Sequence, residues 1–416
     1  MTNPQGLDRR RFLATGASFM AGMALAGPAA ARVRVFGGSR ERAHRRNLVL
    51  VQLSGGNDGL SMIVPHGDDA YHRVRSTIRV ALKDVLRIDD YRGFHPDLGG
   101  LRGIYDEGSL AVVEGCGYPD PVRSHFKALE IWHTARATGR HSGPGWVGRL
   151  GETEWKNDPT IELVVHVGNT APYSLFSTER PPVAFATPTG YRWVGDDGDV
   201  EAYRRAAEPV DDSAADPAPS AAKDDLVARL RGVMQDADQS SQRIRRAAAA
   251  HRPRVPYPIE PLGASLQTVA AMIDGDLGTR VYSVELGGFD THENQSGKYA
   301  NNVRRFDKAL TAFYDDLRKR DCFDDTLIIV FSEFGRRVAE NGSKGTDHGV
   351  AGPMLVLGSQ VNGGIYGRHP SLTELDEGDL IHTTDFRRVY ATAIERWLGE
   401  DSQRALGGSY EPLEFV

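Results

Sequence analysis

Carboxylates and histidines that follow apolar runs are the residues of this chain best suited to chemistry. The candidates are Asp58; Ser124 and His125; Asp290 and His292; Glu333; and Asp347 and His348. Carboxylates and imidazoles that converge repel one another or lie idle unless a cation holds them. Oxygen and nitrogen ligands without thiolate suit zinc, manganese, magnesium or calcium. The pattern predicts a divalent metal site, provided that the fold brings these residues together.

The elements that must position these residues are short apolar strands alternating with helices. Apolar, β-branched runs predict buried strands, and the stretches between them have helical periodicity. The predicted strands are 47–53, 109–115, 280–286, 326–331 and 354–358, and the predicted helices are 97–107, 124–137, 300–320 and 385–398. This alternation favours an α/β fold, a three-layer sandwich with a mainly parallel central sheet. In such a sheet ligands bind beyond the carboxyl ends of the strands, where the candidate residues lie.

Several candidates also have structural explanations. Asp58, in Gly-Gly-Asn-Asp-Gly, suits a turn, because Asp tolerates left-handed backbone conformations. Ser124 stands where a helix begins and fits an N-cap; it also fits a nucleophile, because the positive helix end stabilises an alkoxide and an anionic substrate. Asp290 and His292, two residues apart after a Gly-Gly turn, have no core-packing purpose and are expected to be ligands rather than surface residues.

The remaining candidates concern the late loops and the substrate. Glu333 fits either a ligand or a helix-start carboxylate paired with Arg336. Asp347 and His348, between glycines, are better explained as a ligand loop than as core residues. The candidate substrate contacts are Asn57, Arg123, His125 and Arg336. The two arginines suit bidentate binding of an anion, although most arginines are solvated surface charges.

The first 31 residues carry the features of an export signal. Paired arginines at 9–10 precede a charge-free stretch rich in Ala, Gly and Met, and Ala29-Ala30-Ala31 supplies small residues for cleavage. This predicts a twin-arginine signal peptide at 1–31, the twin-arginine translocase as partner, and a periplasmic or extracellular location. An uncleaved N-terminal anchor is the alternative. No other segment is long and apolar enough to cross a bilayer, so the mature protein is expected to have no stable transmembrane span.

Composition and charge favour one large globular domain. The 416 residues are 40% hydrophobic and 25% charged, as is ordinary for a soluble protein. The domain is expected to span 47–416 after a basic flexible segment at 32–46. An insertion or cap is expected at about 151–260, and it contains a solvated linker at 206–223. The formal charge of -6 offers no general attraction for nucleic acid, and two cysteines allow one disulfide at most.

Six segments together resemble the bacterial domain-of-unknown-function family DUF1501. They are LVQLSGGNDGLSMIVP, GYPDPVRSHFKALEIWHTA, GWVGRL, VELGGFDTHENQ, LIIVFSEFGRRVAENGSKGTDHGVAGPMLVLG and TDFRRVYATAIERWLG. The resemblance runs from about Asn47 to the C-terminus. That family looks like a branch of the alkaline phosphatase and sulfatase superfamily, whose α/β sandwiches use two metals and a Ser, Thr or modified Cys nucleophile. The resemblance therefore implies an alkaline-phosphatase-like fold.

The resemblance also implies roles for particular residues. Asp58 resembles the first-strand metal ligand, and Ser124 resembles the nucleophile at a helix start. Asp290 with His292 resembles the ligand pair after a central strand. Glu333 takes the place that Asp-His usually holds, and His348 resembles the late histidine ligand. The sequence has no Cys-x-Pro-x-Arg motif, which argues against formylglycine chemistry.

Two functions remain as alternatives. The first is an exported metal-dependent hydrolase of phosphate or sulfate esters, in which Ser124 attacks with metal assistance. The second is a non-catalytic cell-envelope protein that binds an acidic glycan or assembles with an exported partner on the same scaffold. A bound metal with substrate turnover would support the first. A vacant or calcium-only site with large exposed apolar patches would support the second.

Overall fold

The structure is a computed structural model that describes residues 46–136, 143–192 and 221–416. The predicted signal peptide at 1–31 lies outside the described residues. So do all but the last residue of the predicted basic segment at 32–46 and most of the predicted linker at 206–223. Among the helices of the described ranges, none has both the length and the apolar character needed to cross a bilayer.

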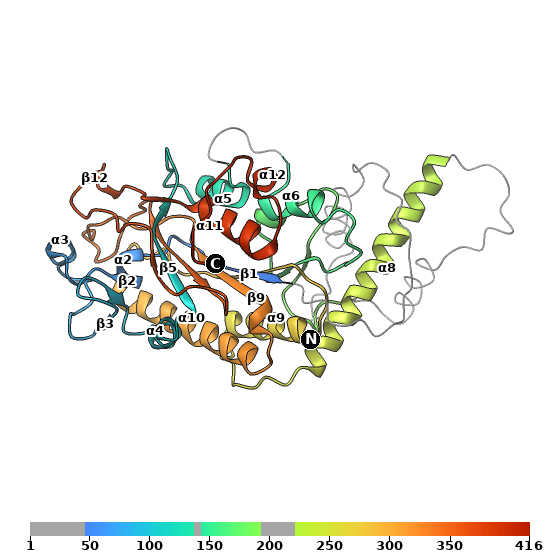
Figure 1. Cartoon of the computed structure of the whole chain (residues 1–416), viewed down its shortest axis with the longest axis horizontal. Coiled ribbons are helices and arrows are strands. Elements are labelled where there is room, and N and C mark those ends of the chain that lie inside the picture. Colours follow the sequence, from blue (N-terminus) through green and yellow to red (C-terminus); the bar gives the residue numbers. More distant parts are fainter. Residues whose placement is uncertain (1–45, 137–142, 193–220) are drawn as a thin grey trace, which may run out of the picture.

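A central sheet, nine-stranded within the described ranges, forms the middle of the molecule (Figure 1). Its strand order is β11-β5-β10-β9-β1-β8-β6-β7, and β14 also pairs with β5. The strands are β1 (Asn47–Leu53), β5 (Leu110–Gly117), β6 (Val164–Val167), β7 (Val183–Phe185), β8 (Val281–Leu286), β9 (Thr326–Phe331), β10 (Gly352–Leu357), β11 (Gly364–Tyr366) and β14 (Thr384–Asp385). Most neighbours are parallel, whereas β10 is antiparallel to both β5 and β9. The predicted α/β fold with a mainly parallel sheet is confirmed.

Helices cover both faces of the sheet, and β1 shows why. All of its residues are buried; Val49 and Val51 belong to one apolar cluster, and Leu48 and Leu50 to another. Successive side chains of a strand point to opposite faces, so a strand buried on both sides is mostly apolar. One face packs against α4 (Gly99–Asp106), α9 (Pro261–Asp274) and α10 (Gln295–Arg318). The other packs against α5 (His125–Thr134), α6 (Trp146–Thr153), α11 (Phe386–Thr392), η4 (Ala393–Leu398) and α12 (Ser402–Leu406).

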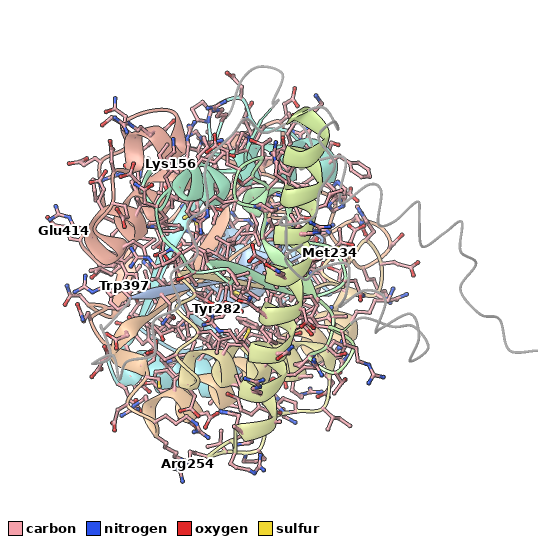
Figure 2. All side chains as sticks on the ribbon, turned by 90° about the vertical axis from the view of Figure 1, so that its right-hand side faces the viewer. Lys156, Met234, Arg254, Tyr282, Trp397 and Glu414 are labelled. Atoms are coloured by element: carbon pink, nitrogen blue, oxygen red, sulfur yellow. The ribbon has the colours of Figure 1, made fainter. Side chains whose placement is uncertain are left out.

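The segment expected to form an insertion or cap at about 151–260 contributes directly to the sheet. Within it, β6 and β7 extend the sheet in parallel beyond β8. The long helix α8 (Ala221–Ala250) then runs along this side of the molecule, as Figure 2 shows. The two strands have only four and three residues, too few for their periodicity to identify them in the sequence. This segment therefore completes the central layer.

Short elements fill the connections. They are α2 (Gly59–Met62), β2 (Ile63–Val64), α3 (Asp69–Val74), β3 (Leu86–Arg87), β4 (Gly93–Phe94), η1 (Tyr173–Leu175), η3 (Phe323–Asp325), β12 (Leu375–Asp376) and β13 (Asp379–Leu380). The two cysteines, Cys116 and Cys322, are buried. They belong to the clusters on opposite faces of the sheet. The sheet thus separates the two thiols.

Strand direction brings five chain segments to one edge of the sheet. Strands β1, β8 and β9 are parallel, so their carboxyl ends lie together. Strand β10 is antiparallel to β9 and to β5, so β5 also ends at this edge and β10 begins there. The residues that follow β1, β5, β8 and β9 therefore meet the residues that precede β10. This is the edge where parallel sheets place their ligands.

Candidate metal centre

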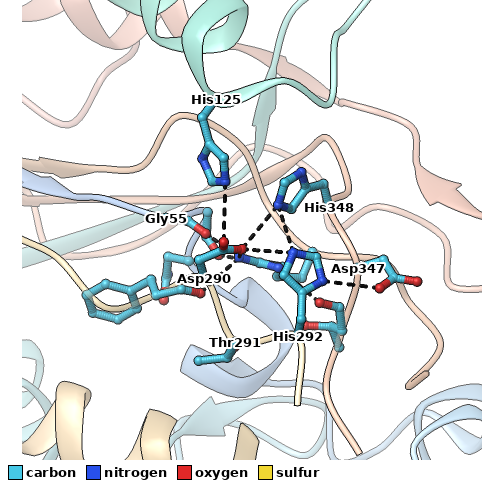
Figure 3. Close-up of polar contacts among 12 residues, drawn as sticks. Gly55, His125, Asp290, Thr291, His292, Asp347 and His348 are labelled. Atoms are coloured by element: carbon cyan, nitrogen blue, oxygen red, sulfur yellow. Dashed lines mark hydrogen bonds and ion pairs between the residues drawn. The ribbon is translucent and has the colours of Figure 1, made fainter. Parts of the chain in front are cut away.

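Three histidines converge on the carboxylate of Asp290 (Figure 3). The Nε2 atom of His292 lies 3.0 Å from Asp290 Oδ1, and that of His348 lies 3.1 Å from the same oxygen. The Nε2 atom of His125 lies 3.7 Å from Asp290 Oδ2. The Nε2 atoms of His292 and His348 are themselves 3.0 Å apart. The three rings come from the start of α5, the loop after β8 and the loop before β10.

Each of these rings is held at its Nδ1 atom by an oxygen acceptor. The pairs are His125 with Glu333 Oε1 at 2.8 Å, His292 with Asp347 Oδ1 at 3.2 Å, and His348 with the carbonyl oxygen of Arg123 at 2.8 Å. A carbonyl or ionised carboxylate oxygen only accepts hydrogen bonds, so Nδ1 carries the hydrogen in all three rings. In the neutral rings, each Nε2 atom therefore presents a lone pair.

This arrangement leaves electron-rich atoms facing one another. Lone pairs at three Nε2 atoms and the charge of Asp290 repel unless a cation lies among them. The separations of 3.0–3.1 Å among His292 Nε2, His348 Nε2 and Asp290 Oδ1 resemble the spacing of ligands around one ion. Tetrahedral zinc with bonds of about 2.0–2.1 Å places neighbouring ligands about 3.3 Å apart. His125, Asp290 and His348 also offer ligand atoms within 4.8 Å of one another. The residues fit a divalent metal.

Arg336 holds Asp290 in the ionised state. Its Nη2 atom donates to Asp290 Oδ1 at 2.6 Å. Burial acts to raise the pKa of Asp290, but the hydrogen bond from Arg336 and the charge of its guanidinium lower it. The guanidinium is fully buried and also donates to the carbonyl oxygens of Gly55, Gly56, Phe289 and Thr346. Arg336, predicted to contact substrate, therefore connects several loops, because its guanidinium N–H groups donate to oxygen atoms of the protein itself.

Glu333 supports His125 instead of joining the converging atoms. Its Oε1 atom accepts from His125 and from the backbone N–H of Gly55 at 2.9 Å. Burial acts to raise the pKa of Glu333, but the bond to His125 and nearby backbone N–H groups lower it. The same bond raises the pKa of His125 against the effect of burial. A carboxylate behind a histidine fixes its tautomer and its direction, as in carboxylate–histidine–zinc sites.

Asp347 has the corresponding role behind His292. Its pKa is lowered by a hydrogen bond from Asn341 and, against burial, by the bond to His292. Asn341 Nδ2 donates to Asp347 Oδ1 at 3.0 Å and to the carbonyl oxygen of His292 at 2.9 Å. Sequence reasoning missed Asn341; the only local signal is an Asn-Gly pair, which indicates a turn.

Asp58 pairs with Arg75 and does not join the residues that converge on Asp290. Its Oδ2 atom accepts from Arg75 Nη1 at 2.6 Å and from Ser61 Oγ at 2.6 Å, and Gln295 also donates to Oδ2. Its Oδ1 atom accepts from Arg75 Nη2 at 2.9 Å. Burial acts to raise the pKa of Asp58, but Arg75 and the other donors lower it. The predicted ligand is thus a buried structural carboxylate, because protein donors occupy its oxygens.

Two predicted substrate contacts are also engaged elsewhere. Asn57 is buried, and its Oδ1 atom accepts from Tyr299 Oη at 2.9 Å. The side chain of Arg123 pairs with Asp379 at 2.5 Å and Glu377 at 3.1 Å. The carbonyl oxygen of Arg123 accepts from His348 Nδ1, and its guanidinium connects the segment before α5 to the β12–β13 hairpin.

Ser124 occupies the N-cap position of α5 and is exposed. Its side chain makes no capping hydrogen bond. Ser124 therefore stands at the N-cap position without making the hydrogen bond that would stabilise the helix start. The first-turn N–H groups of α5 are left without a cap from Ser124, directly beside His125 in the sequence.

A cleft of about 470 Å³ opens next to the converging residues. His125 and Glu333, which also belong to the centre, line this cleft, and so do Gln52 and His133. Gln52 Oε1 accepts from His133 Nε2 at 2.8 Å. Burial lowers the pKa of His133 to about 4, so this ring is neutral at neutral pH. Neither residue was predicted, because a single Gln in a strand and a single His in a helix do not form a recognisable sequence motif.

Solved structures similar to this chain include three proteins at low sequence identity. The PsFucS1 sulfatase from Pseudoalteromonas sp. has 10% identity and a TM-score of 0.39 over 89% of this chain and 71% of its own. The C-terminal periplasmic domain of EcEptC from Escherichia coli, in complex with Zn, has 10% identity and a TM-score of 0.38 over 76% and 73%. A protein in the alkaline phosphatase superfamily from Vibrio parahaemolyticus has 13% identity and a TM-score of 0.32 over 77% and 62%.

Sequence comparison gives the family. No curated protein matches the sequence. The profile of one family, described as "Protein of unknown function (DUF1501)", matches residues 114–406, which is more than half of the chain and includes the residues that converge on Asp290. The predicted family is therefore confirmed: this chain belongs to the DUF1501 family.

Proposed function

We propose that this protein is a metal-dependent hydrolase of phosphate or sulfate esters. One observation carries the proposal: three histidines, each committed at Nδ1, direct Nε2 at the carboxylate of Asp290. His125, His292, His348 and Asp290 would hold the cation. Three nitrogen ligands and one oxygen ligand favour zinc over magnesium or calcium. When bound, the cation supplies Lewis-acid polarisation of an ester oxygen.

The residues of the chain then have separate tasks. Glu333 and Asp347 fix the direction of their histidine rings, and Arg336 keeps Asp290 ionised. The uncapped start of α5 offers backbone N–H groups to an anionic oxygen of the ester. This anion site and the proposed cation site lie side by side, because His125 is the first residue of α5. The arrangement suits an ester whose charged group carries several oxygens.

We assign the attack to Ser124. The residue is exposed and its side chain makes no capping bond, which supports its availability to a bound ester. The Oγ atom forms a bond to phosphorus or sulfur while the bond to the alcohol oxygen breaks, and the alcohol leaves with the proton that the serine gives up. Water then cleaves the ester on Ser124 and restores the hydroxyl.

The test combines metal analysis with turnover. Protein purified with chelator and reloaded should hold stoichiometric zinc and hydrolyse at least one member of a panel of phosphate monoesters, phosphate diesters and sulfate esters. His292→Ala and His348→Ala should lose zinc, whereas His72→Ala should keep it, because His72 bonds to the carbonyl oxygen of His66 outside the centre. Absence of bound zinc would refute the site. Zinc-loaded protein that is inert to the whole panel would favour the envelope-binding alternative.

Export remains part of the proposal. Residues 1–31, with their paired arginines, support passage through the twin-arginine translocase to the periplasm or the outside of the cell. Intact-mass measurement of exported protein should show a chain that begins after Ala31. Full-length exported protein would contradict cleavage. Export unaffected by Arg9→Lys with Arg10→Lys would contradict the route.

A further inference from the structure

The cleft beside the centre has an unusual charge distribution. Among the described residues that line it, two are carboxylates, Glu285 and Glu333, and none is a lysine or arginine. The charge of Glu333 is engaged by His125 and backbone N–H groups. Glu285 is exposed on β8, and within the described ranges it has no ion-pair partner. A negative group in this cleft would therefore lie near Glu285, with no lysine or arginine among the described lining residues to offset the repulsion.

Two adjacent glycines at the end of β8 show where the cleft has free space. A Cβ atom on Gly287 would meet nothing within 4 Å, so this residue borders open space. Gly288 differs, because its φ is +102° and a Cβ atom there would lie 2.9 Å from Asn302 Nδ2. A side chain at position 287, in the lining of the cleft, would thus extend into open space without a steric clash, whereas one at 288 would disturb the loop.

We infer that this cleft binds the alcohol portion of the ester and selects alcohols that carry no negative charge. The inference rests on the proposed function, which places the anionic group of the ester at the metal centre. His125 and Glu333, which belong to both, join that centre to the cleft. The volume of about 470 Å³ lies within the range of small-molecule sites, about 300–1,000 Å³. Glu285 accepts hydrogen bonds from hydroxyl or ammonium groups and repels carboxylates, and Gly287 provides the space.

The first test compares esters that differ in the charge of the alcohol. Phosphocholine should be a better substrate of the zinc-loaded protein than 2-phosphoglycerate. Glu285→Lys should shift the ratio of their kcat/KM values towards phosphoglycerate by about tenfold, the size expected when a charge a few ångströms away is reversed near solvent. Glu414→Lys is the matched control, because Glu414 is exposed outside the cleft. An unchanged ratio in Glu285→Lys would overturn the inference.

A binding test does not depend on turnover. Saturation-transfer NMR on zinc-loaded protein should detect both choline and its uncharged analogue 3,3-dimethyl-1-butanol. Glu285→Lys should remove the choline signal and leave that of the neutral alcohol, whereas Gly287→Leu should weaken both at unchanged zinc content. If both variants bind choline as the wild type does, the cleft is not the alcohol site. If the variants change binding as expected but no ester is hydrolysed, the inference about the cleft stands and the proposed hydrolysis fails.

Discussion

Replacing Glu333 by glutamine removes one buried charge and preserves the hydrogen bonds around it. In the wild type, Glu333 Oε1 accepts from Gly55 N at 2.9 Å and from His125 Nδ1 at 2.8 Å, and Oε2 lies 3.1 Å from Ser332 Oγ. The amide oxygen of glutamine can accept both bonds. Its NH₂ group can donate to Ser332 Oγ, whose own hydrogen goes to the carbonyl oxygen of Leu53 at 2.6 Å. The substitution therefore removes the charge and keeps an acceptor for Gly55 and His125.

The expected effect follows from the strength of a charged acceptor. A hydrogen bond to a charged group contributes about 1.5–3 kcal/mol and a neutral one about 0.5–1.5 kcal/mol, so the metal-free protein should lose about 1 kcal/mol of unfolding free energy. Loss of a carboxylate behind a ligating histidine typically weakens metal binding about 10–100-fold. That range corresponds to about 1.4–2.7 kcal/mol of binding free energy.

Zinc affinity is measured by competition with a chromogenic chelator at neutral pH, and unfolding free energy by urea titration with chelator present. Glu333→Ala is the contrast, because it leaves the Gly55 N–H and the His125 Nδ1–H without their acceptor and should cost more stability than Glu333→Gln. Glu414→Gln is the control for loss of a remote surface charge. A folded Glu333→Gln protein with wild-type zinc affinity would refute the claim that the charge of this carboxylate strengthens zinc binding through His125.

Three further predictions concern the pH dependence of stability, the buried carboxylate of Asp58 and the proposed nucleophile Ser124. With chelator present, the stability difference between wild type and Glu333→Gln should be largest from about pH 4.5 to about pH 6.5. The lowered pKa of Glu333 gives stability that is lost as pH falls below this range, and the raised pKa of His125 gives stability that is lost as pH rises above it. Urea unfolding measured below, within and above this range tests both losses. Asp58→Ala should cost about 3–5 kcal/mol by leaving Arg75 buried and unpaired, with zinc content unchanged; loss of zinc at full stability would make Asp58 a ligand instead. Ser124→Ala should change unfolding free energy by less than about 0.5 kcal/mol and abolish turnover with zinc retained; full turnover would exclude the serine as nucleophile.

The sheet was largely predictable because its signal is local. The five apolar runs at 47–53, 109–115, 280–286, 326–331 and 354–358 all correspond to strands of one sheet. A strand buried on both faces is apolar along most of its length, and that property can be read from adjacent residues. The direction of β10 could not be read in this way, because an antiparallel strand between parallel ones has the same composition. Strands β6 and β7 were missed because they are too short for a period.

The order of residues along the chain shows which polar groups follow the strands, whereas the role of each group depends on the side chains that face it in the folded protein. Asp58 and Asp290 both follow buried strands, but a carboxylate takes its role from the cation that faces it. Arg75 fills the oxygens of Asp58, whereas three histidines face Asp290. The partner of His125 is Glu333, 208 residues away, and no local pattern reveals such a pair. Side-chain type is a property of one position, whereas charge compensation depends on contacts that exist only after the sheet has assembled.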